Sequence, residues 1–203
     1  MTAHELPANH HADHPGFSGV VGAAIGLGLL LMGPHNARLA AELTGVGPGD
    51  RVVDIGCGPG NAVREAARRG AHATGVDPSP MMLRLARTFT RDGRIAWMEG
   101  AAEQVPLADG SATVLWSLAT VHHWKDVDAG LREARRVLAP GGRLLAVERQ
   151  TEPGATGPAG HGWTEQQSHT FAAQCRRAGF TGVAVSGHRS GRRRVWAVTA
   201  TRP

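Results

Sequence analysis

The residue types best suited to chemistry in this sequence lie in one short run, Val52–Gly60, which joins an apolar stretch to a glycine-rich turn. Three glycines at alternate positions, Gly56, Gly58 and Gly60, allow backbone torsions and a close ligand approach that a Cβ atom would obstruct. The apolar residues before them predict a buried strand, and a helix opening after the turn would point its free amide groups toward a ligand there. The run therefore predicts a loop that binds a nucleotide-like cofactor.

An acidic residue, Asp77, ends the next apolar run, seventeen residues after Gly60. An acidic side chain at the end of that strand can accept hydrogen bonds from both hydroxyls of a ribose. Another acid, Asp54, lies within the first predicted strand itself. The glycine loop, the spacing and the acid at the second strand end therefore agree on a ligand that contains a ribose.

Two adjacent histidines, His122 and His123, follow the fourth predicted strand. Open α/β sheets place their ligands at the carboxyl ends of the strands, so either ring could remove a proton from a bound acceptor. Histidine suits this role because its charge changes near neutral pH. A structural alternative stays open: one ring could cap the helix that begins near Asp126, with Trp124 filling a gap beneath the loop.

We expect the chain to hold no metal. Asp126 and Asp128 could ligate a divalent ion, but Asp126 is a natural helix N-cap and no third ligand is evident in the sequence. Four histidines within residues 4–14 could bind a transition metal adventitiously, yet their setting among Pro, Asn and Asp is typical of a solvated segment. Residues 1–16 are therefore expected to form a disordered His-rich tail.

Apolar runs that alternate with amphipathic stretches predict the elements that would position these side chains, and the pattern is typical of an α/β protein with a parallel sheet. The expected strands are residues 51–55, 73–76, 95–98, 113–117 and 143–148. The expected helices are residues 79–91, 127–138 and 164–178, and the Pro140–Gly142 turn stops the second of them. Two β-rich runs, residues 182–186 and 195–201, predict a closing antiparallel hairpin.

Length and composition indicate one domain of modest size. The 203 residues divide into the tail (1–16), an N-terminal helical cap (17–48) and a main domain (49–203). The net charge of +5 is carried by arginine, since Lys125 is the only lysine, and we attribute it to composition more than to nucleic-acid binding. Two cysteines far apart in sequence give no disulfide framework and favour a cytoplasmic location. The apolar stretch Val20–Met32 is too short to cross a bilayer, so no integral membrane association is expected.

Five segments carry a family resemblance: residues 53–60, 75–79, 100–107, 121–124 and 133–142. Through them the chain, over roughly residues 49–203, resembles the class I S-adenosylmethionine-dependent methyltransferases of the small-molecule type, similar to the ubiquinone/menaquinone-biosynthesis enzymes. The resemblance implies an α/β fold, a Rossmann-like doubly wound seven-stranded sheet of order 3-2-1-4-5-7-6 with strand 7 antiparallel. It also implies S-adenosylmethionine as cofactor and S-adenosylhomocysteine as product.

The resemblance also implies which residues contact the cofactor. The loop glycines would line the methionine and ribose portion, Asp54 would orient the methionine end, and Asp77 would hold the ribose hydroxyls. Near the adenine, many relatives carry Asp where this chain has Ala101, which implies weaker binding here. The full expected set is Asp54, Gly56, Cys57, Gly58, Gly60, Asp77, Pro78, Met82, Ala101, Ala102, Glu103, Ser117 and Leu118.

Other function classes fit the sequence less well. A dinucleotide-dependent dehydrogenase would space its glycines as G-x-G-x-x-G, whereas this loop has one residue between each pair. The segment after the fourth strand, Ser117–Thr120, lacks the Asn/Asp-Pro-Pro-aromatic sequence of amino-nitrogen transfer. This leaves a small-molecule acceptor, with oxygen or carbon favoured over nitrogen, in a pocket formed by residues 17–35 and 151–163. The alternatives are a non-catalytic S-adenosylmethionine-binding regulatory or assembly protein, and an RNA methyltransferase.

Overall fold

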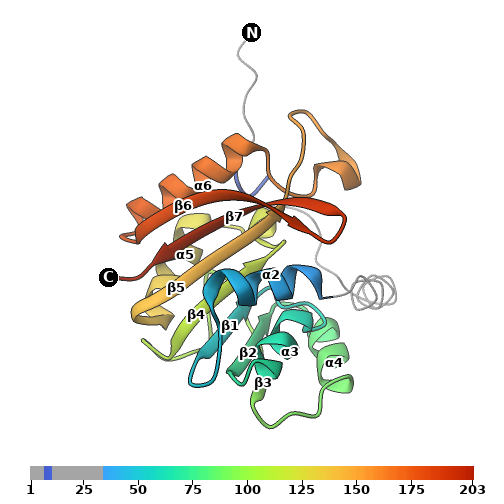
Figure 1. The fold of residues 1–203 in the computed structure, drawn as a ribbon, viewed down its shortest axis with the longest axis vertical. Coiled ribbons are helices and arrows are strands. Elements are labelled where there is room, and N and C mark those ends of the chain that lie inside the picture. The colour runs from blue at the N-terminus through green and yellow to red at the C-terminus, as the bar shows by residue number, and fades with distance from the viewer. Residues whose placement is uncertain (1–6, 11–33) are drawn as a thin grey trace.

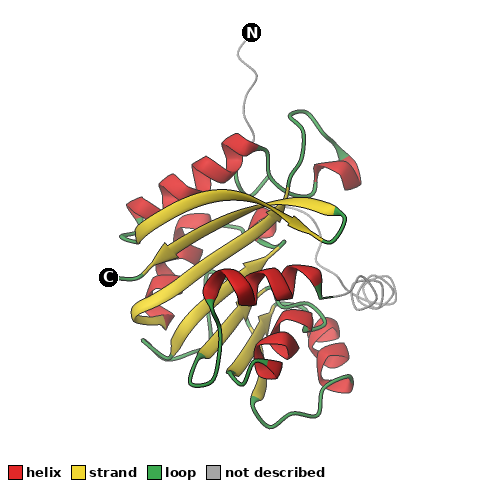
Figure 2. Ribbon diagram, viewed as in Figure 1, coloured by secondary structure: helices red, strands yellow, loops and turns green. Residues whose placement is uncertain are grey.

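The computed structural model describes residues 7–10 and 34–203, and a seven-stranded sheet forms its centre (Figures 1 and 2). The strands are β1 (Arg51–Ile55), β2 (His72–Asp77), β3 (Ile95–Glu99), β4 (Ala112–Leu118), β5 (Leu138–Arg149), β6 (Thr181–Ser190) and β7 (Arg193–Thr201). The α-helices are α2 (His35–Thr44), α3 (Asn61–Arg68), α4 (Pro80–Thr88), α5 (Val127–Val137) and α6 (Glu165–Arg177). Two short 3₁₀ helices are η1 (Val121–His123) and η2 (Gly157–Gly160).

The strand order is β3-β2-β1-β4-β5-β7-β6. Strand β1 pairs in parallel with β2 and β4, and β3 and β5 extend the parallel part on either side. Strand β7 runs antiparallel to both β5 and β6. The expected α/β fold, its strand order and the reversed seventh strand are confirmed. Because β1 and β4 are neighbours where the order reverses, their carboxyl ends lie at the point where such sheets bind ligands.

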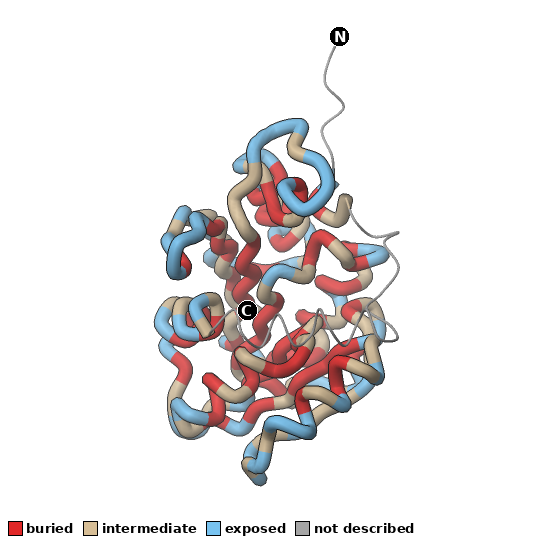
Figure 3. Tube along the Cα trace, turned by 90° about the vertical axis from the view of Figure 1, so that its right-hand side faces the viewer, coloured by how far each residue is buried: buried red, intermediate tan, exposed pale blue. Residues whose placement is uncertain are grey.

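Two apolar cores lie on the opposite faces of this sheet, because successive side chains of a strand point to opposite sides. Val53 and Ile55 belong to the core that holds Leu131 of α5 and Phe171 of α6. Val52 belongs to the other core, with residues of α2, α3 and α4. Figure 3 shows the buried residues running through the middle of the molecule between exposed outer turns. The sheet is therefore covered on both faces, and its strand ends remain for a site.

Side chains cap the helices that flank the site. Asp126 Oδ1 accepts a hydrogen bond from the Ala129 amide at 2.9 Å, so the predicted N-cap of α5 is confirmed. Thr164 and Gln167 exchange hydrogen bonds in a capping box at the start of α6. The Ser79 side chain accepts from the Met82 amide ahead of α4. Each cap fixes the residue at which a loop of the site gives way to a helix.

Residues 7–10 differ from the expected tail, because they pack on the domain. Ala8 is buried in the same core as α5 and α6, and its carbonyl accepts a hydrogen bond from Trp163 Nε1 at 2.8 Å. Residues 11–33, with the apolar stretch and most of the expected helical cap, lie outside the described residues. Within the described part of the chain, no helix is both long and apolar enough to cross a bilayer.

The element bounds depart from the sequence prediction mainly at β5. This strand begins at Leu138, immediately after α5, whereas the sequence predicted a tight turn and a strand from residue 143. Leu138 is fully buried and pairs with Ala112 of β4 ahead of a register shift, so burial overrides the turn signal of Pro140–Gly142. The expected long loop after β5 contains the short helix η2 and stands out as an exposed segment in Figure 3.

A truncation in the centre of the sheet should measure how far this core holds the fold. Leu145 of β5 is fully buried, so Leu145→Ala should lower the free energy of unfolding by about 2–5 kcal/mol through lost contacts and a residual cavity. Phe89, which is 54% exposed after α4, is the control, and Phe89→Ala should change it by about 0.5 kcal/mol or less. Urea unfolding followed by circular dichroism gives both values. Equal losses would contradict the described packing.

Candidate functional site

The loop after β1 is tied to the end of β2 by one carboxylate. Asp77 Oδ2 accepts a hydrogen bond from the Gly58 amide at 2.8 Å, and Asp77 Oδ1 accepts one from the Ser79 amide at 2.8 Å. The amides of Gly56 and Cys57 both donate to the carbonyl of Val76, one residue earlier. The predicted juxtaposition of the glycine loop and the acid at residue 77 is therefore present in the structure.

The three loop glycines have different physical reasons to be glycine. A Cβ on Gly56 would lie 2.6 Å from the Thr120 side chain, and one on Gly60 would lie 2.1 Å from the Trp97 ring. A Cβ on Gly58 would meet no atom within 4 Å, although its φ of +51° favours glycine. Packing therefore requires glycine at two positions, whereas the side-chain direction of Gly58 is open.

Asp54, near the end of β1 and two residues before Gly56, has a side-chain oxygen atom without a hydrogen-bond partner among the described residues. Its side chain is buried, and its Oδ1 atom has no hydrogen-bond partner among the described residues. Burial, and in second place the negative charge of Asp77, raises the pKa of Asp54 well above its usual value. A buried carboxyl with an unused acceptor is costly, so this position fits a ligand that brings a hydrogen-bond donor or a positive charge.

The neighbouring titratable groups respond to the same burial. Burial raises the pKa of Asp77, while the amides of Ser79 and Gly58 act in the opposite direction because they favour the charged form. Burial also raises the pKa of the Cys57 thiol well above its usual value, with Asp54 and Asp77 adding to the effect. A buried thiol with a raised pKa is a poor nucleophile, and the Cys57 side chain packs beside Gly75.

The segment after β4 joins its strand end to the end of β1. Thr120 Oγ1 donates to the Ile55 carbonyl at 3.0 Å and lies 2.6 Å from Ser117 Oγ. Between them, Ala119 has a φ of +60°, which is a costly conformation for a residue with a side chain. Strained backbone of this kind persists only where its surroundings fix it, as they do at many ligand sites. The turn brings η1, with its histidines, next to the glycine loop.

His122 is held by a buried acid that the sequence analysis did not single out. Its Nδ1 atom lies 2.8 Å from Glu148 Oε2, and its backbone amide donates to Glu148 Oε1 at 3.4 Å. Glu148 is completely buried at the end of β5. The adjacent His123 ring lies 4.1 Å from the His122 ring, centroid to centroid. Asp126 supplies the N-cap of α5, and Trp124 packs against Gly130 beneath the loop.

The other residues predicted to contact the cofactor have different local surroundings. Met82 and Ala102 are buried, and Ala101 forms a short bridge with Gln104. Glu103 Oε1 accepts hydrogen bonds from the amides of Lys125 and Asp126, so its carboxylate braces the turn between η1 and α5. Pro78 and Leu118 stand at the ends of β2 and β4, where the predicted site lies.

Sequence reasoning missed four residues that shape the site: Thr120, Glu148, Trp97 and His161. The sequence could have indicated Glu148, because this acid ends an apolar run as Asp77 does. The roles of Trp97 and Thr120 can be recognised only once the pairing of β3 with β2 and of β4 with β1 is known. His161 lies in a Pro/Gly-rich segment whose path no local pattern indicates.

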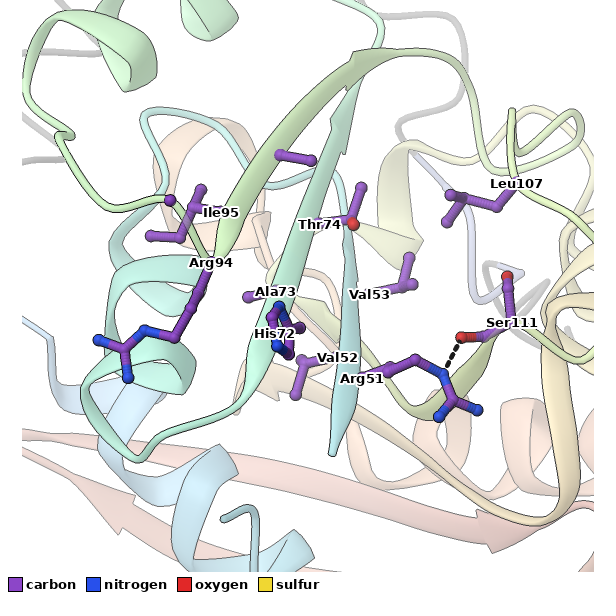
Figure 4. A pocket seen from close by; sticks show the side chains of 12 residues that line it. Arg51, Val52, Val53, His72, Ala73, Thr74, Arg94, Ile95, Leu107 and Ser111 are labelled. Atoms are coloured by element: carbon purple, nitrogen blue, oxygen red, sulfur yellow. Dashed lines mark hydrogen bonds between the residues drawn. The ribbon is translucent and has the colours of Figure 1, made fainter. Parts of the chain in front are cut away.

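A cavity of about 240 Å³ opens at the other end of the sheet. Figure 4 shows Arg51, His72 and Arg94 around it, at the amino ends of β1 and β2 and ahead of β3, with Arg51 Nε donating to the Ser111 carbonyl at 2.6 Å. Its wall includes the apolar side chains of Val53, Ile95 and Leu107, and it contains none of Asp54, Asp77, His122 and His123. We therefore locate the candidate site at the carboxyl ends of the strands.

Comparison with known proteins gives consistent matches. Residues 53–146 match the family described as "Methyltransferase domain". Demethylmenaquinone methyltransferase of Tropheryma whipplei is 36% identical over 119 residues, which cover 58% of this chain and 49% of that protein. 27-O-demethylrifamycin SV methyltransferase of Amycolatopsis mediterranei is 36% identical over 128 residues, covering 59% and 47%. The chain thus spans about half the length of these curated relatives.

The fold has counterparts among solved structures. A SAM dependent methyltransferase from Aquifex aeolicus superposes with a TM-score of 0.69 at 16% identity, over 82% of this chain and 89% of that one. At this identity the likeness concerns the fold alone. It agrees with the seven-stranded order and the reversed seventh strand described above.

Removing the charge of Asp54 should stabilise the ligand-free protein in a pH-dependent way. The pKa of Asp54 is raised in the folded chain, so this carboxyl group ionises at a lower pH in the unfolded chain than in the folded one. The free energy of unfolding of the wild type therefore falls as the pH rises above about 3.8, the ordinary pKa of the group. Asp54→Asn cannot ionise, so its advantage over wild type in free energy of unfolding should grow from pH 4 to pH 8. Glu152→Gln, at an exposed position, is the control in the same urea titrations. A difference that shrinks with rising pH would contradict the buried assignment.

Proposed function

We propose that this chain, whose residues 53–146 match a methyltransferase domain, is a class I S-adenosylmethionine-dependent enzyme that transfers a methyl group from S-adenosylmethionine to a small-molecule acceptor and releases S-adenosylhomocysteine. The observation that carries the proposal is the arrangement of Asp54, Gly58 and Asp77. A buried acceptor atom without a partner and a carboxylate at a strand end flank one glycine that faces open space.

These residues fit the chemical groups of S-adenosylmethionine. The unused Oδ1 atom of Asp54 suits the ammonium group of the methionine portion, because a cation offsets the cost of a buried carboxylate. Asp77 keeps lone pairs for the two ribose hydroxyls while its oxygens also accept the Gly58 and Ser79 amides. When bound, the cofactor supplies an electrophilic methyl group on a sulfonium.

We also propose a wider binding shell from the sequence assignment. Backbone groups of Ser117 and Leu118 would border the methionine portion. The segment with Pro78, Met82, Ala101, Ala102 and Glu103 would enclose the adenine. Gly56, Cys57 and Gly60 would contribute backbone, since the side-chain direction of two of them is filled by Thr120 and Trp97.

The chain would act chiefly by positioning two ligands and excluding water. The acceptor atom attacks the methyl carbon, the methyl–sulfur bond breaks with its electron pair going to sulfur, and the acceptor loses a proton. His122 and His123 are the groups that we propose act on the acceptor, because η1 follows β4 beside the glycine loop. Glu148 orients the His122 ring through its contact with Nδ1.

A small acceptor with a reactive oxygen or carbon is favoured. The named relatives act on a demethylated menaquinone and on a demethylated rifamycin, and the second name specifies an oxygen. The loop of residues 151–163 lies beside the histidines and would form part of the acceptor pocket. An RNA acceptor is not favoured by these relatives. We also propose a cytoplasmic location, which suits the two buried free cysteines.

Loss of the Asp77 carboxylate should weaken cofactor binding strongly. Asp77→Ala removes the proposed ribose acceptor and its hydrogen bonds from the amides of Gly58 in the loop and Ser79 at the start of α4, so the Kd for S-adenosylmethionine and S-adenosylhomocysteine should rise about 100-fold or more. Asp128→Ala, on the exposed side of α5, should leave the Kd unchanged. Isothermal titration calorimetry measures both, with circular dichroism as the check on folding. An unchanged Kd in a folded Asp77→Ala protein would overturn the ribose assignment.

Turnover should appear with a small acceptor. Methyl-labelled S-adenosylmethionine is incubated with the chain and a panel of phenols, quinols and hydroxylated metabolites, and labelled product and S-adenosylhomocysteine are quantified together. On an identified acceptor, His123→Ala should lower kcat by about 100-fold or more while the Kd for S-adenosylmethionine stays the same. His169→Ala, an exposed position on α6, is the control. Tight cofactor binding without any product would favour the regulatory alternative, and labelled RNA would favour an RNA methyltransferase.

A further inference from the structure

Three histidines from two separate segments of the chain lie close together at η1. His122 and His123 come from η1, and His161 comes from the segment after η2. One ring nitrogen of each lies within 4.8 Å of the other two. The His161 ring centroid lies 5.5 Å from that of His122 and 5.6 Å from that of His123. Imidazole nitrogens gathered in this way are the ligand set that divalent transition metals prefer.

The buried member of the cluster has the support that metal-binding histidines usually have. Glu148 Oε2 lies 2.8 Å from His122 Nδ1, and both side chains are buried. A carboxylate on one ring nitrogen fixes the tautomer and the orientation of the ring, and it makes the other nitrogen a stronger ligand. The hydrogen bond therefore presents His122 Nε2 as the ligand atom.

His161 is held in place by its neighbours in sequence. Trp163, which is fully buried, donates its backbone amide to the Arg149 carbonyl at 2.8 Å, so the segment is anchored one residue beyond Glu148. On the other side, His10 Nε2 lies 2.9 Å from the Gly160 carbonyl. The second ring nitrogen of His10 lies 3.1 Å from Gln167 Nε2, so this histidine braces the loop and is not counted among the ligands.

We propose that His122, His123 and His161 bind one divalent transition-metal ion of the Zn²⁺ type. Tetrahedral Zn²⁺ with bonds of about 2.0–2.1 Å requires ligand nitrogens about 3.4 Å apart, so the partly exposed rings of His123 and His161 close by small side-chain rotations. With these three ligands from the described part of the chain, tetrahedral geometry would have a fourth position that water or an oxygen of the acceptor could take. The expectation of a chain without metal was based on Asp126, Asp128 and the histidines of the tail, and none of these residues belongs to the cluster.

The ion deepens the role given to His122 and His123. With their ring nitrogens bound, the ion itself would meet an acceptor oxygen, and a cation there lowers the pKa of a coordinated hydroxyl or water. The binding inference rests on the cluster alone and does not require the methyl-transfer proposal. Metal binding and cofactor binding are therefore measured separately on the same variants.

The test is Zn²⁺ binding by the full chain without an affinity tag, after removal of metals with a chelator. Competition with a zinc-sensitive dye should give one tight Zn²⁺ per chain, and Co²⁺ should give the visible bands of a tetrahedral site with nitrogen ligands. His123→Ala and His161→Ala should each raise the Kd for Zn²⁺ at least 10-fold, and Glu148→Gln should raise it about 10- to 100-fold. His161 is partly exposed, so its variant is the one expected to keep the fold.

Two controls separate this cluster from the other histidines. A variant with His4, His11 and His14 all changed to Ala removes every histidine of residues 1–16 except His10 as a source of ligands, and it should keep the wild-type Kd for Zn²⁺. His169→Ala should do the same. Unchanged Zn²⁺ affinity in folded His161→Ala, or loss of binding in the tail variant, would overturn the proposal. The Kd for S-adenosylmethionine should be unchanged in His161→Ala, and a chain that binds Zn²⁺ without binding this cofactor would keep the metal site and refute the proposed function.

Discussion

The site depends on one buried carboxylate that satisfies backbone amides from two places at once. Asp77 accepts from Gly58 and from Ser79, so the loop after β1 and the start of α4 are held by the same side chain. The parallel register, in which Ile55 pairs with Val76, makes this contact possible because it brings the two strand ends level. A buried charge is tolerated only with such partners. The glycine loop, and with it the place for a ligand, therefore takes its shape from a bond made before any ligand binds.

Packing around the loop leaves only a narrow choice of residues. Trp97 fills the space that a side chain at Gly60 would need and also lies against Gly75, so β3 supports the loop from the edge of the sheet. Thr120 does the same at Gly56 and joins β4 to β1 through the Ile55 carbonyl. Side chains from β3 and from the turn after β4 thus support the loop that follows β1. The rigidity of the site comes from these contacts.

The parts of the structure that follow from local patterns were predictable. The seven strands, the reversed last strand and the N-cap at Asp126 were expected from periodicity, capping chemistry and family resemblance, and the structure confirms them. The start of β5 was not, because the burial of Leu138 against Ala112 overrides a local turn signal. The histidine cluster was hidden for a related reason: His161 joins His122 only through pairing of segments distant in sequence. Local rules describe elements well, whereas the meeting of loops is a property of the whole fold.

The carboxyl group of Asp54 has a consequence for any cationic ligand. Because burial and the charge of Asp77 favour its protonated form in the empty protein, a ligand that brings a positive charge to Oδ1 favours the ionised form. Association is then coupled to release of a proton into solvent, so apparent affinity and observed heat both contain an ionisation component. The empty site thus favours a cationic ligand over a neutral analogue of the same shape, because the neutral analogue can only form a hydrogen bond with the protonated acid.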